Sequence, residues 1–132
     1  MMNEALAEAA LRFVGVRFRL HGRVPETGLD CVGLVAAAMQ DAGYAPHTPQ
    51  GYSLRNVSVA HWLGHAGQSG LIRAEADGDV VLCMANPVQP HLLIAVPGGF
   101  VHAHAGLGRV TFMPDPLPWP ITMQWHLADK DD

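Results

Sequence analysis

The sequence contains few cysteines, little positive charge and no long apolar run. Its 132 residues include two cysteines, Cys31 and Cys83, so a disulfide framework is not expected. Lys and Arg total 8 against 12 for Asp and Glu, and the formal charge of −4 argues against binding nucleic acid or an anionic membrane by charge alone. The longest apolar runs are far shorter than the ~20 residues of a membrane helix. A hydrophobic content of 49% is nevertheless typical of a folded chain.

The length predicts a single domain spanning residues 1–132, because domains commonly have on the order of 100–150 residues. The polar segment 128–132 is expected to be a frayed tail. Glu4 and Glu8 stand where a secretion signal would carry basic residues, and the segment lacks an uninterrupted apolar core. We therefore expect a protein that is synthesised in the cytoplasm without a signal peptide.

Two segments have the pattern of helices. Asn3 can cap a helix over residues 4–14, in which apolar side chains recur at helical spacing. Asp30 can cap a second helix over residues 31–41, which is apolar nearly all round and is expected to be buried in the centre of the fold. Residues 56–67 are a candidate for a third helix. Loops are expected over residues 15–30 and 44–55.

From residue 79 onward, the pattern changes to short aliphatic runs separated by turn signals. Asn86-Pro87, Pro90 and Pro97-Gly98-Gly99 mark the expected turns. Helices followed by antiparallel strands predict an α+β fold, with N-terminal helices packed on an antiparallel sheet. The expected strands are 80–84, 92–96, 100–103 and 109–113, and apolar residues that alternate with polar ones predict a further strand over 121–127, buried on one face.

The segment around Cys31 carries the strongest chemical signal. It places a thiol in the first turn of a buried helix, where backbone N–H groups and the helix dipole favour an anion and are expected to lower the thiol pKa. The same N–H groups can stabilise an oxyanion after attack on a carbonyl. A thiolate nucleophile also needs an imidazole base and a group that orients it. His91 and His102, on two strands joined by a Pro-Gly-Gly turn, are the candidates for these roles.

Several motifs resemble those of the NlpC/p60 cell-wall cysteine peptidases. The nucleophile region of that family is similar to residues 18–22 (Phe-Arg-Leu-His-Gly) and 28–35 (Gly-Leu-Asp-Cys-Val-Gly-Leu-Val). The strands around the family's catalytic histidine and third polar residue are similar to residues 78–81, 91–95 and 100–103. The histidine-rich form of the first motif looks most like the phage-tail and gene-transfer-agent branch.

The resemblance implies a papain-like fold and hydrolysis of an amide bond in peptidoglycan stem peptides, commonly between D-glutamate and a diamino acid. It assigns Cys31 as the nucleophile, His91 as the general base and His102 as the orienting residue, and it implies no cofactor and no metal. A tail particle or lysis would deliver such an enzyme to the cell wall. The implied partners are therefore a peptidoglycan peptide and phage-tail proteins, with neither nucleic acid nor a membrane.

Four residues are expected to contact the substrate, namely Phe18, His21, Asp30 and Tyr44. Phe18 stands where the family often has tyrosine, and Val32 follows the nucleophile where the family often has serine. The missing tyrosine hydroxyl affects the expected substrate contact more than the acyl chemistry. Tyr44 either frames the substrate groove or caps the core.

The sequence is compatible with three alternatives. His104 follows His102 by two positions on one face of a strand, so it rivals His102 for the orienting role. His61 and His65 have a spacing that suits a zinc pair, although no third ligand is obvious and the Glu of a metalloprotease helix is missing. A tail structural or adaptor module that retains the fold with little catalysis also fits the sequence. Cys83, within an apolar strand, is expected to pack in the core.

Overall fold

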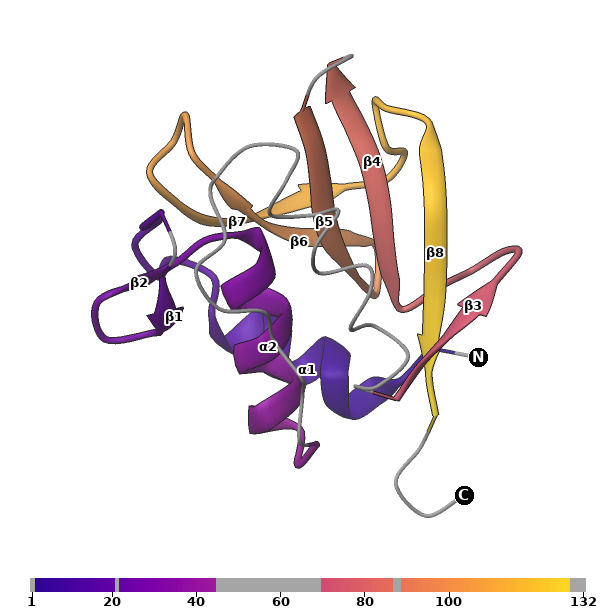
Figure 1. Cartoon of the computed structure of the whole chain (residues 1–132), viewed down its shortest axis with the longest axis horizontal. Coiled ribbons are helices and arrows are strands. Elements are labelled where there is room, and N and C mark those ends of the chain that lie inside the picture. The colour runs from indigo at the N-terminus through magenta and orange to yellow at the C-terminus, as the bar shows by residue number, and fades with distance from the viewer. Residues whose placement is uncertain (1, 21, 45–69, 87–88, 129–132) are drawn as a thin grey trace.

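The computed structural model describes residues 2–20, 22–44, 70–86 and 89–128. The candidate helix over 56–67, nearly all of the loop over 44–55 and most of the expected tail lie outside these residues. Within the described residues, two helices pack against one side of a curved antiparallel sheet (Figure 1). Neither of these two helices has the length and apolarity needed to cross a membrane.

The first helix, α1 (Glu4–Arg12), begins where the sequence predicts. The Asn3 side chain accepts a hydrogen bond from the Leu6 N–H at 3.0 Å and so caps the helix. Leu6 is buried together with three alanines, whereas Glu8 faces water. The helix ends at Arg12 rather than at residue 14, because Phe13 already serves as its C-cap.

The second helix, α2 (Cys31–Asp41), has the predicted bounds. The Asp30 carboxylate accepts a hydrogen bond from the Gly33 N–H at 2.8 Å and caps it. Every residue from Val32 to Met39 is buried, because the helix packs against both α1 and the sheet. Cys31 is therefore the first residue of a helix that is held on several sides.

The segment before α2 is more ordered than the loop that the sequence predicts. Strands β1 (Arg23–Val24) and β2 (Gly28–Leu29) form a small antiparallel hairpin. The Leu29 N–H donates to the Arg17 carbonyl at 2.9 Å, and Phe18 forms a parallel bridge with Leu29. These backbone contacts hold Phe18 beside the start of α2.

Two glycines allow the chain before α2 to lie directly against the helix. A Cβ atom on Gly33 would stand 1.8 Å from the Gly22 carbonyl oxygen, and a Cβ atom on Gly22 would stand 2.1 Å from the Gly28 carbonyl oxygen. Both distances are far below contact distance, so only glycine fits at these positions. The close approach joins the hairpin to the first turn of α2.

The main sheet has six antiparallel strands in the order β3-β8-β4-β5-β6-β7. Five correspond to predicted strands, and β3 is additional. The turn predicted at Pro90 is wrong, because this residue lies inside β5 opposite Met84. On its other side, β5 pairs with β6 only from Ile94 to Val96, so the missing N–H of proline interrupts no ladder there. The strands are β3 (Leu71–Ala74), β4 (Val80–Asn86), β5 (Gln89–Val96), β6 (Gly99–His104), β7 (Arg109–Pro114) and β8 (Ile121–Leu127).

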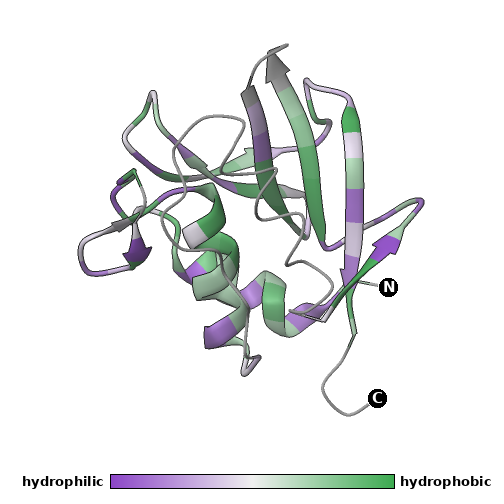
Figure 2. Ribbon diagram, in the orientation of Figure 1, coloured by the Kyte–Doolittle hydropathy of each residue, from purple (hydrophilic) through white to green (hydrophobic). Residues whose placement is uncertain are grey.

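The middle of the sheet is covered on both faces. Leu82 and Leu92 belong to the main core between the helices and the sheet. Residues that alternate with these along the strands point to the opposite face and form a smaller cluster. Accordingly, β4 is hydrophobic along nearly its whole described length in Figure 2. The smaller cluster consists of Val81, Cys83 and Leu93 with Phe100, Met113, Leu117 and Trp119. Cys83 therefore packs in a core, as expected.

Asp79 ties the beginning of α1 to the sheet. Its carboxylate, in a residue that is 2% exposed, accepts the Asn3 N–H at 2.7 Å and the Leu127 N–H at 2.8 Å. The Asn3 side chain in turn donates to the Leu127 carbonyl at 2.9 Å. One carboxylate thus satisfies two backbone donors that burial separates from water.

Asp79→Ala is expected to lower the free energy of unfolding by about 2–4 kcal/mol, because it leaves two buried N–H groups without their acceptor. Urea unfolding followed by circular dichroism measures the change. Glu75→Ala removes an exposed carboxylate nearby and should change the free energy by less than about 0.5 kcal/mol. Equal effects of the two substitutions would contradict the role of Asp79.

Candidate active site

A cavity of about 250 Å³ lies between the start of α2, strands β5 and β6, and the segment that joins β7 to β8. It brings Cys31, His91 and His102 together with Phe18 from the chain before α2. Among the described residues, no Asp, Glu, Lys or Arg lines it, so its chemistry depends on a thiol, imidazoles and aromatic rings. The lining residues are Phe18, Cys31, Pro90, His91, His102, Ala103, His104, Ala105, Gly106 and Trp119.

The sulfur of Cys31 accepts a hydrogen bond from the backbone N–H of Leu92, which follows His91 on strand β5. Burial, followed by the nearby Asp30 carboxylate, raises the pKa of the thiol from 9.0 to about 12. Hydrogen bonds from the backbone N–H groups of Leu92, Val32 and Cys31 itself lower the pKa but do not outweigh these effects. The prediction of a lowered thiol pKa is therefore wrong. The amides at the start of α2 do act on the sulfur, but the loss of water has the larger effect.

His91 and His102 form a hydrogen-bonded pair across β5 and β6. Nε2 of His91 lies 2.8 Å from Nδ1 of His102, and the two rings are nearly perpendicular, at 81°. Burial, with a smaller contribution from neighbouring histidines, lowers the pKa of each imidazole from 6.5 to about 4. Both rings are thus neutral at pH 7, so one nitrogen of the pair donates the shared hydrogen and the other accepts it.

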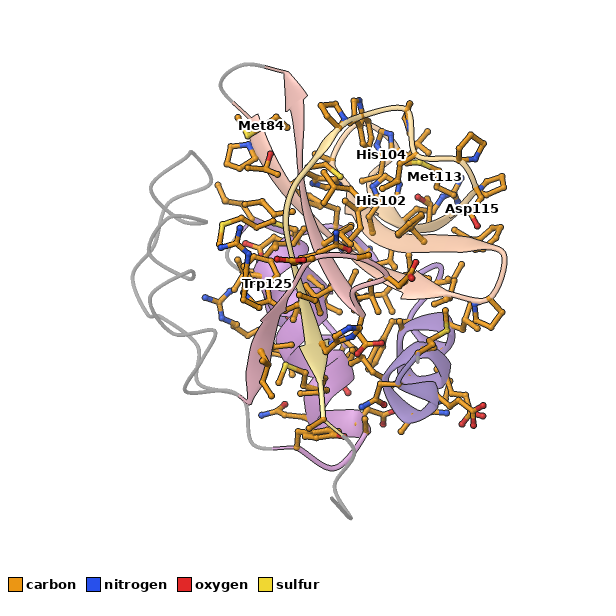
Figure 3. All side chains as sticks on the ribbon, turned by 90° about the vertical axis from the view of Figure 1, so that its right-hand side faces the viewer. Met84, His102, His104, Met113, Asp115 and Trp125 are labelled. Atoms are coloured by element: carbon orange, nitrogen blue, oxygen red, sulfur yellow. The ribbon has the colours of Figure 1, made fainter. Side chains whose placement is uncertain are left out.

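His104 lies beside this pair without taking the place of His102. Its ring centroid is 5.3 Å from that of His102, and Figure 3 shows both side chains in the same part of the molecule. Nδ1 of His104 accepts the Leu107 N–H at 3.0 Å. The hydrogen bond from His91 runs to His102, so the geometry favours His102 as the orienting partner.

Trp119 is a site residue that sequence reasoning missed. Its ring centroid lies 6.1 Å from that of His91 and 6.3 Å from that of His102. The residue stands in a proline-rich segment between two strands, where neither a motif nor a hydrophobic period marks it. A lone tryptophan between Pro118 and Pro120 was the only available signal, and it does not indicate which cavity the ring lines.

The residues expected to contact substrate have different surroundings. Phe18 lines the cavity. Asp30 is 1% exposed and caps α2, with Arg23 at 3.6 Å, and the Tyr44 hydroxyl binds Asn3 and the carbonyl of Ala128. The carboxylate of Asp30 and the ring of Tyr44 are therefore engaged in the scaffold, and neither lines this cavity.

The remaining expectations concern residues outside the described part of the chain. His21 lies there, as does the candidate zinc pair of His61 and His65. Within residues 2–20, 22–44, 70–86 and 89–128, no group of three or more His, Cys, Asp or Glu side chains is arranged to hold a metal ion.

Comparison with known proteins identifies the fold. No family model matches the sequence, and no curated protein sequence is similar to it. Among solved structures, NlpC1 from Trichomonas vaginalis matches with a TM-score of 0.64 at 20% identity, over 92% of this chain and 42% of that one. A protein from Staphylococcus aureus, described as similar to a lipoprotein of the NLP/P60 family, matches with a TM-score of 0.58 at 16% identity, over 96% of this chain and 41% of its own.

These similarities show that the chain has the α+β fold of NlpC/P60 proteins, which confirms the fold class expected from the sequence. The chain spans 42% and 41% of the lengths of the two solved proteins. At identities of 20% and 16%, the likeness concerns the fold.

The two histidines predict a loss of stability in mildly acidic solution. Imidazoles of an unfolded chain titrate near 6.5, whereas the pKa of His91 and of His102 in the fold is about 4. Between these values the unfolded state binds more protons, so the free energy of unfolding should fall as the pH falls from about 6.5 to about 4. Urea unfolding at a series of pH values measures this. His102→Gln should flatten the profile, and an equally steep profile in this variant would contradict the assignment.

Proposed function

We propose that this chain is a thiol hydrolase that cleaves an amide bond in the stem peptides of peptidoglycan. One observation carries the proposal: Cys31, at the N-terminus of α2, lines the same cavity as the hydrogen-bonded pair of His91 and His102. The NlpC/P60 fold supports the peptidase class. The resemblance of the motifs around the three residues supports the choice of substrate.

In this mechanism, His91 takes the proton of the Cys31 thiol. Nε2 of His91 is occupied by His102, so Nδ1 is the nitrogen left to act as a base. Nδ1 can accept a proton only when Nε2 carries the hydrogen and donates it to Nδ1 of His102. Because the thiol pKa is about 12 and the imidazole pKa is about 4, both groups are neutral at rest. The proton therefore moves as the sulfur attacks the carbonyl carbon.

Attack on the amide gives a tetrahedral intermediate with a negative charge on oxygen. The backbone N–H groups of Cys31 and Val32, already directed at the sulfur, are available as donors to that charge. His91 returns its proton to the amine nitrogen, the C–N bond breaks, and a thioester remains on Cys31. Water then loses a proton to His91 and attacks the thioester carbon. The C–S bond breaks, the acid leaves, and the sulfur regains its proton.

His102 serves in this scheme as the residue that orients the base. Its Nδ1 accepts the hydrogen on Nε2 of His91, and this selects the tautomer whose other nitrogen is basic. The same hydrogen bond stabilises the imidazolium that forms when His91 takes up the thiol proton. A neutral His102 is required, because a protonated ring would have no lone pair on Nδ1.

Association with a phage tail or gene-transfer agent is part of the proposal and rests on the histidine-rich motif before Cys31. A tail particle, or lysis of the cell, would bring the protein to the cell wall. Purified tail particles should then contain the chain, as mass spectrometry of the particles would test. Its absence from the particles would remove this association without affecting the hydrolase proposal.

Cys31→Ala is expected to reduce the cleavage of muropeptides by at least about a thousandfold, since no nucleophile remains. Chromatography and mass spectrometry of digested peptidoglycan measure the products. Cys83→Ala removes the other thiol, which is buried in the small cluster, and should retain cleavage at the wild-type level. If wild type and Cys31→Ala behave alike on several wall chemotypes, the proposal fails for those substrates.

The high thiol pKa favours a second candidate, a tail structural or adaptor module that keeps the fold with little turnover. A thiol whose pKa is raised by burial to about 12 is neutral at pH 7, as expected in a non-catalytic protein with this fold. In that case, Cys31→Ala would leave every measurable property of the protein unchanged except its reaction with thiol reagents.

Alkylation by iodoacetamide in a Cys83→Ala background separates the two candidates. If His91 assists removal of the thiol proton, His91→Ala should slow alkylation of Cys31 at pH 7 by about tenfold or more. The adaptor candidate predicts equal rates for both proteins. Circular dichroism of both variants checks that the fold is intact, and equal rates in folded proteins would contradict the role of His91 as the base.

A further inference from the structure

We propose that Trp119 is a positioning residue that holds the His91–His102 pair and keeps water away from its hydrogen bond. The indole meets the His91 ring at 85° with centroids 6.1 Å apart, and it meets the His102 ring at 65° with centroids 6.3 Å apart. Both are edge-to-face contacts, the arrangement that aromatic rings prefer. One indole thus lies against both partners of a 2.8 Å hydrogen bond and covers that bond on the side of the segment between β7 and β8.

The position of the indole is set by the sheet rather than by the catalytic helix. Trp119 and Leu117 pack with Val81, Cys83 and Leu93 in the smaller cluster, on the face opposite the main core. The segment that carries them begins where the Asp115 N–H donates to the Gly98 carbonyl at 3.0 Å. In Figure 3, Asp115 lies on the same side of the molecule as His102.

Three prolines restrict the backbone on both sides of the indole. Pro116, Pro118 and Pro120 each fix one backbone dihedral, so little conformational freedom has to be lost when the segment packs. A segment that is anchored at Asp115 and restricted by prolines can hold the Trp119 indole against the two imidazoles when no ligand is bound. This is the behaviour expected of a residue that positions other groups.

Covering the hydrogen bond between His91 and His102 affects the pKa of both imidazoles. Water would compete for the shared hydrogen and would solvate an imidazolium, and both effects would favour protonation. The low pKa of His91 and of His102, about 4 in each case, agrees with the burial of the pair, in which His102 is 2% exposed. The indole thereby helps to keep His91 a neutral base in mildly acidic solution.

Other titratable groups also surround the pair. His104 follows on the same strand, Cys31 approaches from α2, and Cys83 stands opposite His91 on β4. Arg109 on β7 is the register partner of His104. A substitution at Trp119 alters none of these groups, so a change in the titration of the pair would report the loss of the indole.

Nuclear magnetic resonance of protein labelled with ¹⁵N at histidine tests the proposal. Trp119→Ala should raise the pKa of His91 and of His102 by about one to two units toward 6.5, and should speed exchange of the hydrogen that they share. Trp119→Phe keeps a ring at the site and should restore most of the wild-type titration. Trp125→Phe makes the same change in the main core, where the residue is 4% exposed, and should leave both titrations unchanged.

The catalytic consequence rests on the proposed function, whereas the titration does not. If the protein cleaves muropeptides, the acidic limb of the pH profile of kcat/KM should shift to higher pH in Trp119→Ala. The shift should equal the change in the pKa of His91, and Trp119→Phe should reverse most of it. A protein without activity still gives the histidine titrations, so failure of the hydrolase proposal and failure of this inference are distinguishable.

Unchanged histidine titrations in a folded Trp119→Ala protein would overturn the inference. If that variant does not fold, Trp119→Leu replaces it, since leucine retains part of the apolar volume. The wild-type protein provides an independent measurement. Its shared imidazole hydrogen should be visible at pH 7 and should exchange slowly with water, and exchange at the rate of an exposed imidazole would overturn the inference whatever the variants show.

Discussion

The burial of one thiol and two imidazoles at the junction between α2 and strands β5 and β6 determines the chemistry of this site. Burial raises the pKa of the Cys31 thiol and lowers the pKa of His91 and His102, so all three groups are uncharged at neutral pH. A separated thiolate and imidazolium would each lack solvation there. The site is therefore suited to transferring the thiol proton to His91 only as the sulfur attacks. The negative charge then develops on the oxygen of the reacting carbonyl.

The scaffold around this junction consists of close backbone contacts. The carboxylate of Asp30 caps α2, and Gly33 lets the chain at Gly22 lie directly on the first turn of the helix. Elsewhere in the fold, Asp79 joins the start of α1 to β8. Each contact satisfies or requires a buried backbone group, so the start of α2, where Cys31 lies, is held in place through its backbone.

Much of the fold was predictable because its signals are local. Asn3 and Asp30 cap the helices that follow them, and apolar runs or alternating apolar residues mark the five longer strands. The sequence mispredicted Pro90 and β3 because both depend on pairing between strands of the sheet. Pro90 predicts a turn, yet it lies within β5, at a position where β5 does not pair with β6. Strand β3 was missed because it is short, with two exposed residues, and forms by pairing with β8.

The sequence by itself determined that a thiol begins a buried helix and that histidines stand on two adjacent antiparallel strands, since these features depend on neighbours along the chain. The tertiary structure alone decided that His91 bonds to His102 rather than to His104, that Trp119 packs against both rings, and that the thiol pKa rises. These outcomes depend on which distant groups share a cavity and how much water remains between them. Only the packing of the whole chain sets those two quantities.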